Sequence, residues 1–227
     1  MPVISFASSK GGAGKTTSSI ILGTELAAKG AQVVLIDADP AARLAKWAGI
    51  APLPERIEVI KSEGERSILD EIEGAAQRAS FVLVDLEGSA SRLASFAIGE
   101  SDLVIIPSGE EQQDGDAAVD TLAEVVREGR SRGRKIPSAV LLCRTNAAVK
   151  SRLEKFILGE LNRAARVFET QLHRRTAFSA LHNSGGGLRE LDRAEFNGVD
   201  KAIANAQAFA TEVIDMLEKE GGNSDAA

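Results

Sequence analysis

Three short apolar runs restrict the fold of this chain more than any other feature. Residues 33–36 (VVLI), 81–84 (FVLV) and 103–106 (LVII) are continuously apolar and lack the alternation of a strand with one face in solvent. Such runs are typical of strands buried on both faces of a parallel sheet. Parallel strands need long crossover connections, so the helical patterns between the runs are expected to cover both faces. The sequence therefore predicts an α/β fold with a mostly parallel, helix-covered, twisted sheet.

Strand and helix patterns alternate along nearly the whole chain. Strands are predicted near 3–7, 33–37, 57–61, 81–85, 102–107, 138–143 and 166–170, and helices near 15–29, 67–79, 115–132, 149–163 and 199–219. The 227 residues, 44% of them hydrophobic, suffice for one sizeable core, and no internal repeat or long linker divides them. We therefore expect a single domain over 1–219, followed by a short, acidic, disordered tail at 220–227.

Composition and sparse residue types exclude several classes of protein. No apolar run approaches the roughly 18 to 20 residues of a membrane span, and the start of the chain lacks a signal-peptide pattern, so a cytoplasmic location without a membrane partner is expected. Cys143 is the single cysteine, which excludes an intrachain disulfide and favours a buried apolar role. His173 and His182 lie too far from acidic residues to suggest a metal site, and Trp47 with Leu44 fits a core or interface anchor.

The most specific motif is SKGGAGKTT at 9–17, which follows the first predicted strand and opens the first predicted helix. Backbone N–H groups of such a glycine-rich turn can surround a phosphate, Lys15 can neutralise the β and γ phosphates, and the Thr16 hydroxyl can ligate Mg²⁺. Ser9 replaces the usual first glycine, and a second lysine, Lys10, precedes the turn. The residues expected to bind the nucleotide here are Lys10, Gly11, Gly12, Ala13, Gly14, Lys15, Thr16 and Thr17.

Carboxylates follow two of the predicted strands. Asp37 and Asp39 come directly after the second strand, and Asp85 ends the run at 81–84. Open parallel sheets bind ligands at the carboxyl ends of their strands, and phosphoryl transfer needs a metal ion and an oriented water there. A strand-end aspartate by itself is often a helix cap, but together with the glycine-rich loop these three favour a Mg²⁺–nucleotide site.

Taken together, these residues resemble the motifs of the ParA/MinD group of ATPases. Residues 10–17 are similar to the deviant Walker A motif, 37–40 (DADP) to Walker A′, and Asp85 to Walker B. The stretch from 139 to 191 is similar to small plasmid-partition ParA proteins and their VirC-type relatives in DNA transfer. The resemblance implies a single-domain P-loop NTPase that uses ATP and Mg²⁺. The chain departs from many relatives at 85–88 (DLEG in place of DTPP) and at 41–42 (AA in place of QG).

The resemblance also implies a role for each residue. Lys10 would reach across an ATP-bound homodimer to the phosphates of the partner subunit, which explains why the loop has two lysines. Asp39 would orient the attacking water, and Thr16, Asp37 and Asp85 would hold Mg²⁺ and its waters. Arg144 occupies the position where relatives contact the adenine, although it could equally be a surface cation.

The middle of the chain is basic, although the formal net charge of the whole is −6. Between 127 and 175 there are thirteen Lys and Arg residues against four Glu residues, which favours a local, sequence-independent contact with DNA phosphates. A solvated charged face is the simpler alternative for any one of them. The residues expected to contact DNA are Arg163, Arg166, Arg174, Arg175, Arg189 and Arg193.

These expectations combine into one leading hypothesis. An ATP-bound homodimer would bind DNA non-specifically, associate with the nucleoid, and release DNA when a ParB-like or other adaptor protein stimulates hydrolysis, thereby partitioning plasmid or chromosomal DNA. One alternative keeps the cycle but positions a protein assembly over the nucleoid. A MinD-type membrane-surface ATPase is disfavoured because the last predicted helix is acidic and lacks a cationic stripe. A single cysteine also disfavours an iron–sulphur reductase on the same scaffold.

Overall fold

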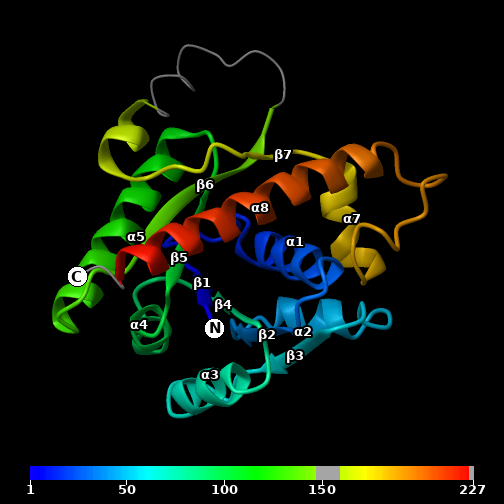
Figure 1. The fold of residues 1–227 in the computed structure, drawn as a ribbon. Coiled ribbons are helices and arrows are strands. Elements are labelled where there is room, and N and C mark those ends of the chain that lie inside the picture. Colours follow the sequence, from blue (N-terminus) through cyan, green and yellow to red (C-terminus); the bar gives the residue numbers. More distant parts are fainter. Residues whose placement is uncertain (147–158, 225–227) are drawn as a thin grey trace.

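The computed structural model describes residues 1–146 and 159–224, and its centre is a seven-stranded sheet in the order β3-β2-β4-β1-β5-β6-β7 (Figure 1). Every strand pairing of this sheet is parallel, which confirms the predicted fold class. The strands are β1 (Val3–Phe6), β2 (Val33–Ala38), β3 (Ile57–Lys61), β4 (Phe81–Leu86), β5 (Leu103–Ser108), β6 (Ser138–Thr145) and β7 (Leu172–His173).

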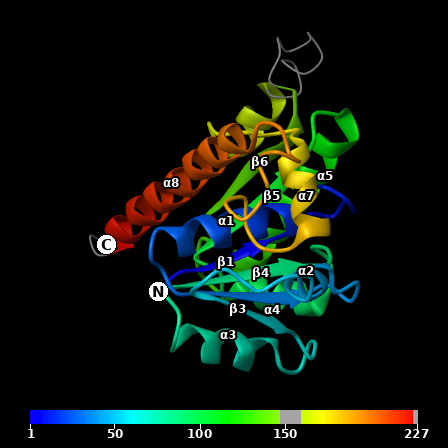
Figure 2. The same ribbon diagram turned by 90° about the vertical axis from the view of Figure 1, so that its right-hand side faces the viewer.

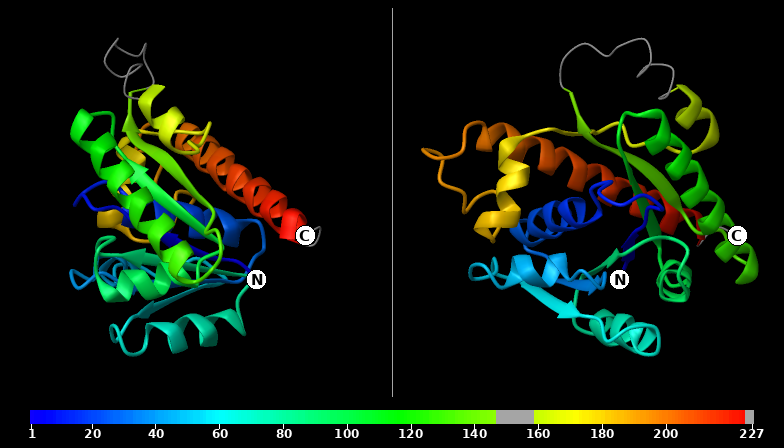
Figure 3. Two further views of the ribbon diagram at one scale, coloured as in Figure 1. Left: turned by 90° about the vertical axis from the view of Figure 1, so that its left-hand side faces the viewer. Right: turned by 180° about the vertical axis from the view of Figure 1, so that it is seen from behind.

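Helices cover both faces of the sheet. They are α1 (Lys15–Ala28), α2 (Arg43–Ala48), α3 (Ile68–Ala76), α4 (Arg92–Gly99), α5 (Gln112–Ser131), α7 (Thr176–Ser184) and α8 (Val199–Ser224). One hydrophobic cluster joins the sheet to α1, α2, α7 and α8, and a second joins its other face to α3, α4 and α5. The views from opposite sides accordingly show α8 and α1 on one side of the sheet and α5 on the other (Figures 1 and 3).

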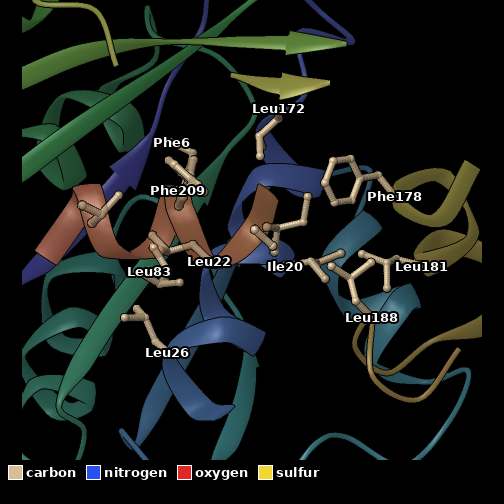
Figure 4. Close-up of a cluster of buried hydrophobic side chains, with 14 of the residues drawn as sticks. Phe6, Ile20, Leu22, Leu26, Leu83, Leu172, Phe178, Leu181, Leu188 and Phe209 are labelled. Atoms are coloured by element: carbon tan, nitrogen blue, oxygen red, sulfur yellow. The ribbon is translucent and has the colours of Figure 1, made fainter. Parts of the chain in front are cut away.

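The larger core lies between α1, α8 and the sheet. Phe6 and Leu83 of the strands, Leu22 and Leu26 of α1, and Phe209 of α8 are all fully or almost fully buried in it (Figure 4). α8 runs alongside α1 across the molecule, as the two views at right angles show (Figures 1 and 2). α1 is therefore enclosed between the sheet and α8, which explains why its side chains are buried over nearly its whole length.

Two individual predictions about the core are confirmed. Trp47 is 1% exposed, and its indole N–H donates to the Gly186 carbonyl at 3.0 Å, so it anchors α2 to the segment that follows α7. Cys143 is a buried free thiol in β6, and burial raises its pKa to about 11. Among the described helices, none is long and apolar enough to cross a membrane.

The predicted strand at 166–170 is wrong in its position. Only an isolated bridge joins Val140 to Val167, and the seventh strand is Leu172–His173. The backbone N–H groups of Glu169 and Thr170 donate to the Glu212 carboxylate of α8 at 2.7 and 2.8 Å. Since these two N–H groups bond to a side chain of α8, they are not available for the hydrogen bonds of a strand ladder.

Other differences concern helices. α2, α4 and α7 were not predicted. α2 and α4 have only 6 and 8 residues, too few for a clear apolar period, and α7 has 9. Of the helix predicted at 149–163, most lies outside the described residues, while 159–164 is helical. α8 continues to Ser224, beyond the predicted end at 219 and into the predicted tail at 220–227, of which the last three residues lie outside the described part.

Candidate functional site

A glycine-rich loop connects β1 to α1 at the carboxyl edge of the sheet. Gly12 and Gly14 have φ angles of 73° and 112°, in the left-handed region that side chains disfavour. A Cβ on Gly14 would lie 3.3 Å from the Cβ of Cys143, so the loop also packs closely against β6. The glycine spacing noted in the sequence is therefore needed both for the backbone turn and for its contact with the sheet.

Lys15 begins α1 and is only 8% exposed. Burial lowers the pKa of its ammonium group, while the charges of Asp85 and Asp39 act in the opposite direction. A buried cation at a helix start, surrounded by backbone N–H groups, is the arrangement that binds phosphate. The position agrees with the predicted phosphate role, which stays a prediction.

Asp37 and Asp85 are brought together by strand register. They are direct partners on β2 and β4, and Asp85 is also the partner of Phe6 at the end of β1. Asp37 accepts hydrogen bonds from the backbone N–H groups of Ala45 at 2.7 Å and Asp39 at 3.2 Å. Burial nevertheless raises its pKa.

Asp85 is the most unusual of the three carboxylates. It is fully buried, and neither of its oxygens accepts a hydrogen bond from any group in the described part of the chain. Burial raises its pKa to about 7, against the opposing influence of the Thr16 hydroxyl and the Lys15 ammonium. Buried oxygens without a donor are costly, and a bound cation would satisfy them.

Asp39 is also buried, but both of its oxygens are engaged. One accepts from the Ala41 backbone N–H at 2.8 Å and the other from Nη1 of Arg43 at 3.1 Å. Arg43 was not identified from the sequence. The sequence indicated it only by its spacing, since Arg43 follows Asp39, the aspartate predicted to orient the water, by four residues.

Two adjoining cavities open beside the loop. One of about 490 Å³ is lined by Gly12 to Thr17 together with Asp39, Arg43, Lys46, Trp47 and His182. The other, of about 390 Å³, lies between the loop, the end of β6, β7 and α7. Both share Gly12, Gly14, Thr17 and His182, and the Thr17 hydroxyl lies 2.7 Å from Nε2 of His182. We call the first the loop cavity and the second the β6–α7 cavity.

The β6–α7 cavity brings together residues that the sequence analysis assigned to different tasks. Arg144, the predicted adenine contact, lines it and has a left-handed backbone with φ 57°. Arg174 and Arg175, predicted to contact DNA, line the same cavity. His182 was missed as a site residue, since a lone histidine in a helical segment carries no signal of its own.

Lys10 makes a contact within its own chain. Its Nζ lies 2.6 Å from Oδ1 of Asp114, a residue of α5 that is 5% exposed. Asp114 also accepts from the Glu111 backbone N–H at 3.4 Å as part of the cap of α5. Within one copy of the chain, the extra lysine is thus held by a buried carboxylate.

Four of the six cations predicted to contact DNA form intrachain ion pairs. Arg163 pairs with Glu160, Arg166 with Glu220, Arg189 with Glu25, and Arg193 with Asp200. The Arg189 pair is bidentate, at 2.5 and 2.9 Å, to a Glu25 side chain that is 1% exposed. Arg189 therefore has a clear structural role, and the DNA contacts stay predictions.

The donors at this edge of the sheet fit Mg²⁺ bound together with a nucleotide. Over residues 1–146 and 159–224, no group of three or more His, Cys, Asp or Glu side chains is placed to hold a metal ion. Mg²⁺ at nucleotide sites is instead held by one or two carboxylates, waters and the substrate phosphates. Asp85, with both oxygens unpaired, and Thr16 at the start of α1 fit that pattern.

Comparisons with known proteins find relatives over nearly the whole chain. Residues 1–219 match the family model described as VirC1 protein. The chain is 38% identical over 218 residues to Protein ParA of Rhizobium radiobacter, covering 96% of this chain and 98% of that protein. It is 32% identical over 191 residues to Protein virC1 of the same species, covering 82% of each. An ATP complex of Cyanothece McdA has the same fold, with a TM-score of 0.73 at 17% identity over 94% of this chain and 96% of that one.

Proposed function

Because the chain belongs to the VirC1 family of ParA/MinD-type ATPases, we propose that it is a Mg²⁺-dependent ATPase that partitions DNA. In this proposal an ATP-bound homodimer binds DNA without reading its sequence, and hydrolysis releases it. The observation that carries the proposal is the convergence of buried Lys15 with Asp37, Asp39 and Asp85 beside the glycine-rich loop.

In this proposal one ATP molecule occupies both cavities. The loop cavity would take the triphosphate, because Lys15 and the backbone N–H groups of the glycine turn supply its positive side. The β6–α7 cavity would take the nucleoside, with Arg144 at its wall. Thr17 and His182 line both cavities and would lie where the two parts of the nucleotide join.

Each acidic residue then has a separate task. Thr16, Asp37 and Asp85 would hold Mg²⁺ and its waters, and the ion would neutralise charge on the β and γ phosphates. Asp39 would orient the attacking water, which requires at least one of its oxygens to be free of its present partners. Lys15 stabilises the negative charge that develops on the transferred phosphoryl group.

Dimerisation would complete the site. A cation inserted from a second subunit neutralises phosphoryl charge in the same way as an arginine finger, and Lys10 is the candidate. In a single chain Lys10 contacts Asp114, so the dimer would exchange this ion pair for one with the partner's phosphates. Pooling the basic segment 127–175 of two subunits would favour DNA, with a ParB-like or other adaptor stimulating release.

A second candidate keeps the ATPase cycle but moves a protein assembly over the nucleoid. Its support is a match of 34% identity over 104 residues, covering 44% of this chain and 40% of that protein, to Maintenance of carboxysome distribution protein A of Synechococcus elongatus. A pull-down of binding partners from the native host separates the two, since a partition ATPase should retain a DNA-bound adaptor and a positioning ATPase a component of the assembly.

The decisive experiment compares Lys15→Ala with wild type and with Lys29→Ala, an exposed lysine beyond the other end of α1. Phosphate release should require Mg²⁺, persist in Lys29→Ala and be lost in Lys15→Ala. Sizing by light scattering with ATP should show dimers of wild type and monomers of Lys10→Ala. Hydrolysis at wild-type rates without Lys15 would exclude the site, and dimers of Lys10→Ala would exclude the role across the interface.

A further inference from the structure

Three cationic side chains and a histidine line the loop cavity. Lys15 comes from the loop end, Arg43 and Lys46 from α2, and His182 from α7. Asp39 is the one carboxylate that the described residues contribute to the same lining. Cations that line one space repel each other unless an anion with several charges lies between them. The loop cavity therefore favours such an anion, and α2 supplies two of its cations, Arg43 and Lys46.

The side chain of Arg43 is held in its position by few contacts. Its side chain is 61% exposed, and it gives Asp39 a single hydrogen bond at 3.1 Å, although a guanidinium carries five N–H donors. The guanidinium lies largely in solvent, so it can leave Asp39 without being desolvated. Asp39 is itself buried, but it keeps the Ala41 backbone N–H as a donor when the pair opens.

The charge of Arg43 already acts on the walls of the cavity. Burial is the main cause that lowers the pKa of His182, and the charge of Arg43 lowers it further. This effect agrees with the cavity lining, which places Arg43 beside the space between Lys15 and His182. Arg43 can therefore reach a ligand there by turning its own side chain.

We propose that Arg43 is a nucleotide-binding residue that transfers its guanidinium from Asp39 to the terminal phosphate of ATP. This inference rests on the proposed ATPase function. A phosphate can accept two parallel N–H bonds from the guanidinium, and such bidentate, charge-assisted bonds are stronger than the single bond to Asp39. The transfer frees Oδ2 of Asp39, so binding of ATP itself uncovers the carboxylate that orients the water. ADP lacks the terminal phosphate and leaves the Arg43–Asp39 pair intact.

The test measures nucleotide affinity without turnover. Trp47 is the single tryptophan of a chain without tyrosine, and it lines the loop cavity, so its fluorescence reports binding. Dissociation constants for a non-hydrolysable ATP analogue and for ADP are measured at protein concentrations where light scattering shows monomers. Calorimetry provides a second measurement of the same constants.

Arg43→Ala should weaken the ATP analogue by about tenfold or more, which corresponds to ~1.4 kcal/mol, and ADP by less than about threefold. Arg43→Lys should recover part of the affinity, because an ammonium retains the charge but not the bidentate geometry. Arg78→Ala is the matched control: Arg78 forms an exposed ion pair with Glu58 away from both cavities, and its loss should leave both constants unchanged.

A double-mutant comparison separates a phosphate contact from simple neutralisation of Asp39. In an Asp39→Asn background no carboxylate charge needs neutralising, so Arg43→Ala should still weaken the ATP analogue selectively if Arg43 contacts the phosphate. No further loss in that background would overturn the inference, as would equal losses for the ATP analogue and ADP. Either result refutes only the role of Arg43 if wild type binds the ATP analogue and Lys15→Ala does not. If wild type binds no nucleotide at all, the proposed ATPase function is wrong and the role of Arg43 is wrong with it.

Discussion

Asp85→Asn should stabilise the nucleotide-free protein, and by an amount that depends on pH. Asp85 is fully buried with both oxygens unpaired, and its pKa is raised from 3.8 to about 7. Between these two values the folded chain keeps a proton that the unfolded chain has released. The free energy of unfolding therefore falls as pH rises through this window, by about 1.4 kcal/mol per pH unit for one such group.

The magnitude follows from the two pKa values. From about pH 5 to about pH 8 the wild type should lose roughly 2 to 3 kcal/mol through this group, because ionisation of the folded state limits the loss above pH 7. Asparagine cannot ionise, so the variant lacks this loss. Asp37 is present in both proteins, so the burial that raises its own pKa does not by itself create a difference between them.

Urea unfolding followed by Trp47 fluorescence, without nucleotide and with a chelator, measures the effect at both pH values. The gain in stability of Asp85→Asn over wild type should be larger at pH 8 than at pH 5 by roughly 2 to 3 kcal/mol. Asp70→Asn, at an exposed position of α3, should follow wild type. Parallel pH profiles of Asp85→Asn and wild type would refute a buried, unpaired carboxylate with a raised pKa, whatever the amide does to packing.

Three further predictions concern the nucleotide cycle. Asp39→Ala should bind ATP and dimerise but release phosphate at least about a hundredfold more slowly, since general-base contributions are of that order; loss of ATP binding in a filter assay would assign Asp39 to the phosphate contacts instead. Asp114→Asn should lower the concentration at which ATP produces dimers in light scattering, because Lys10 loses its intrachain partner; an unchanged midpoint would show that the ion pair does not compete with the interface. Replacing both Arg163 and Arg166 with Ala should weaken ATP-dependent DNA binding by the same factor for unrelated DNA sequences. The slope of log affinity against log salt concentration should fall by roughly 0.9 for each DNA phosphate that is no longer neutralised. An unchanged slope would show that neither arginine contacts DNA.

The sequence predicted the sheet well, and it also predicted that the glycine-rich loop and the aspartates lie at its carboxyl edge, because both features depend on local pattern. Continuous apolar runs identify buried parallel strands, and a glycine-rich loop with a lysine between a strand and a helix is specific for phosphate binding. Asp37 and Asp85 follow such strands directly, so the fold alone brings them together.

What the sequence could not predict depends on contacts between distant segments. Glu212 lies some forty residues from the backbone N–H groups that it takes from the predicted strand at 166–170. The sequence analysis assigned Arg189 to a basic DNA-contacting surface, whereas in the structure it pairs with the buried Glu25 carboxylate. The short helix that carries Arg43 has six residues, too few to show a period. For the predicted strand at 166–170 and for Arg189, a partner distant in the sequence decides the structure against the local pattern. For α2, the helix is too short to produce a recognisable pattern.

Asp37, Asp85 and the end of β1 stand side by side because adjacent strands are in fixed register, with Asp37 opposite Asp85 and Asp85 opposite Phe6. The spacing of Asp37 and Asp85 is thus set by the ladder of the sheet and not by loops. An insertion in a surface loop leaves this spacing unchanged, whereas a one-residue slip within β2 or β4 would turn an aspartate to the opposite face. The two carboxylates are therefore protected from changes in the loops that surround them.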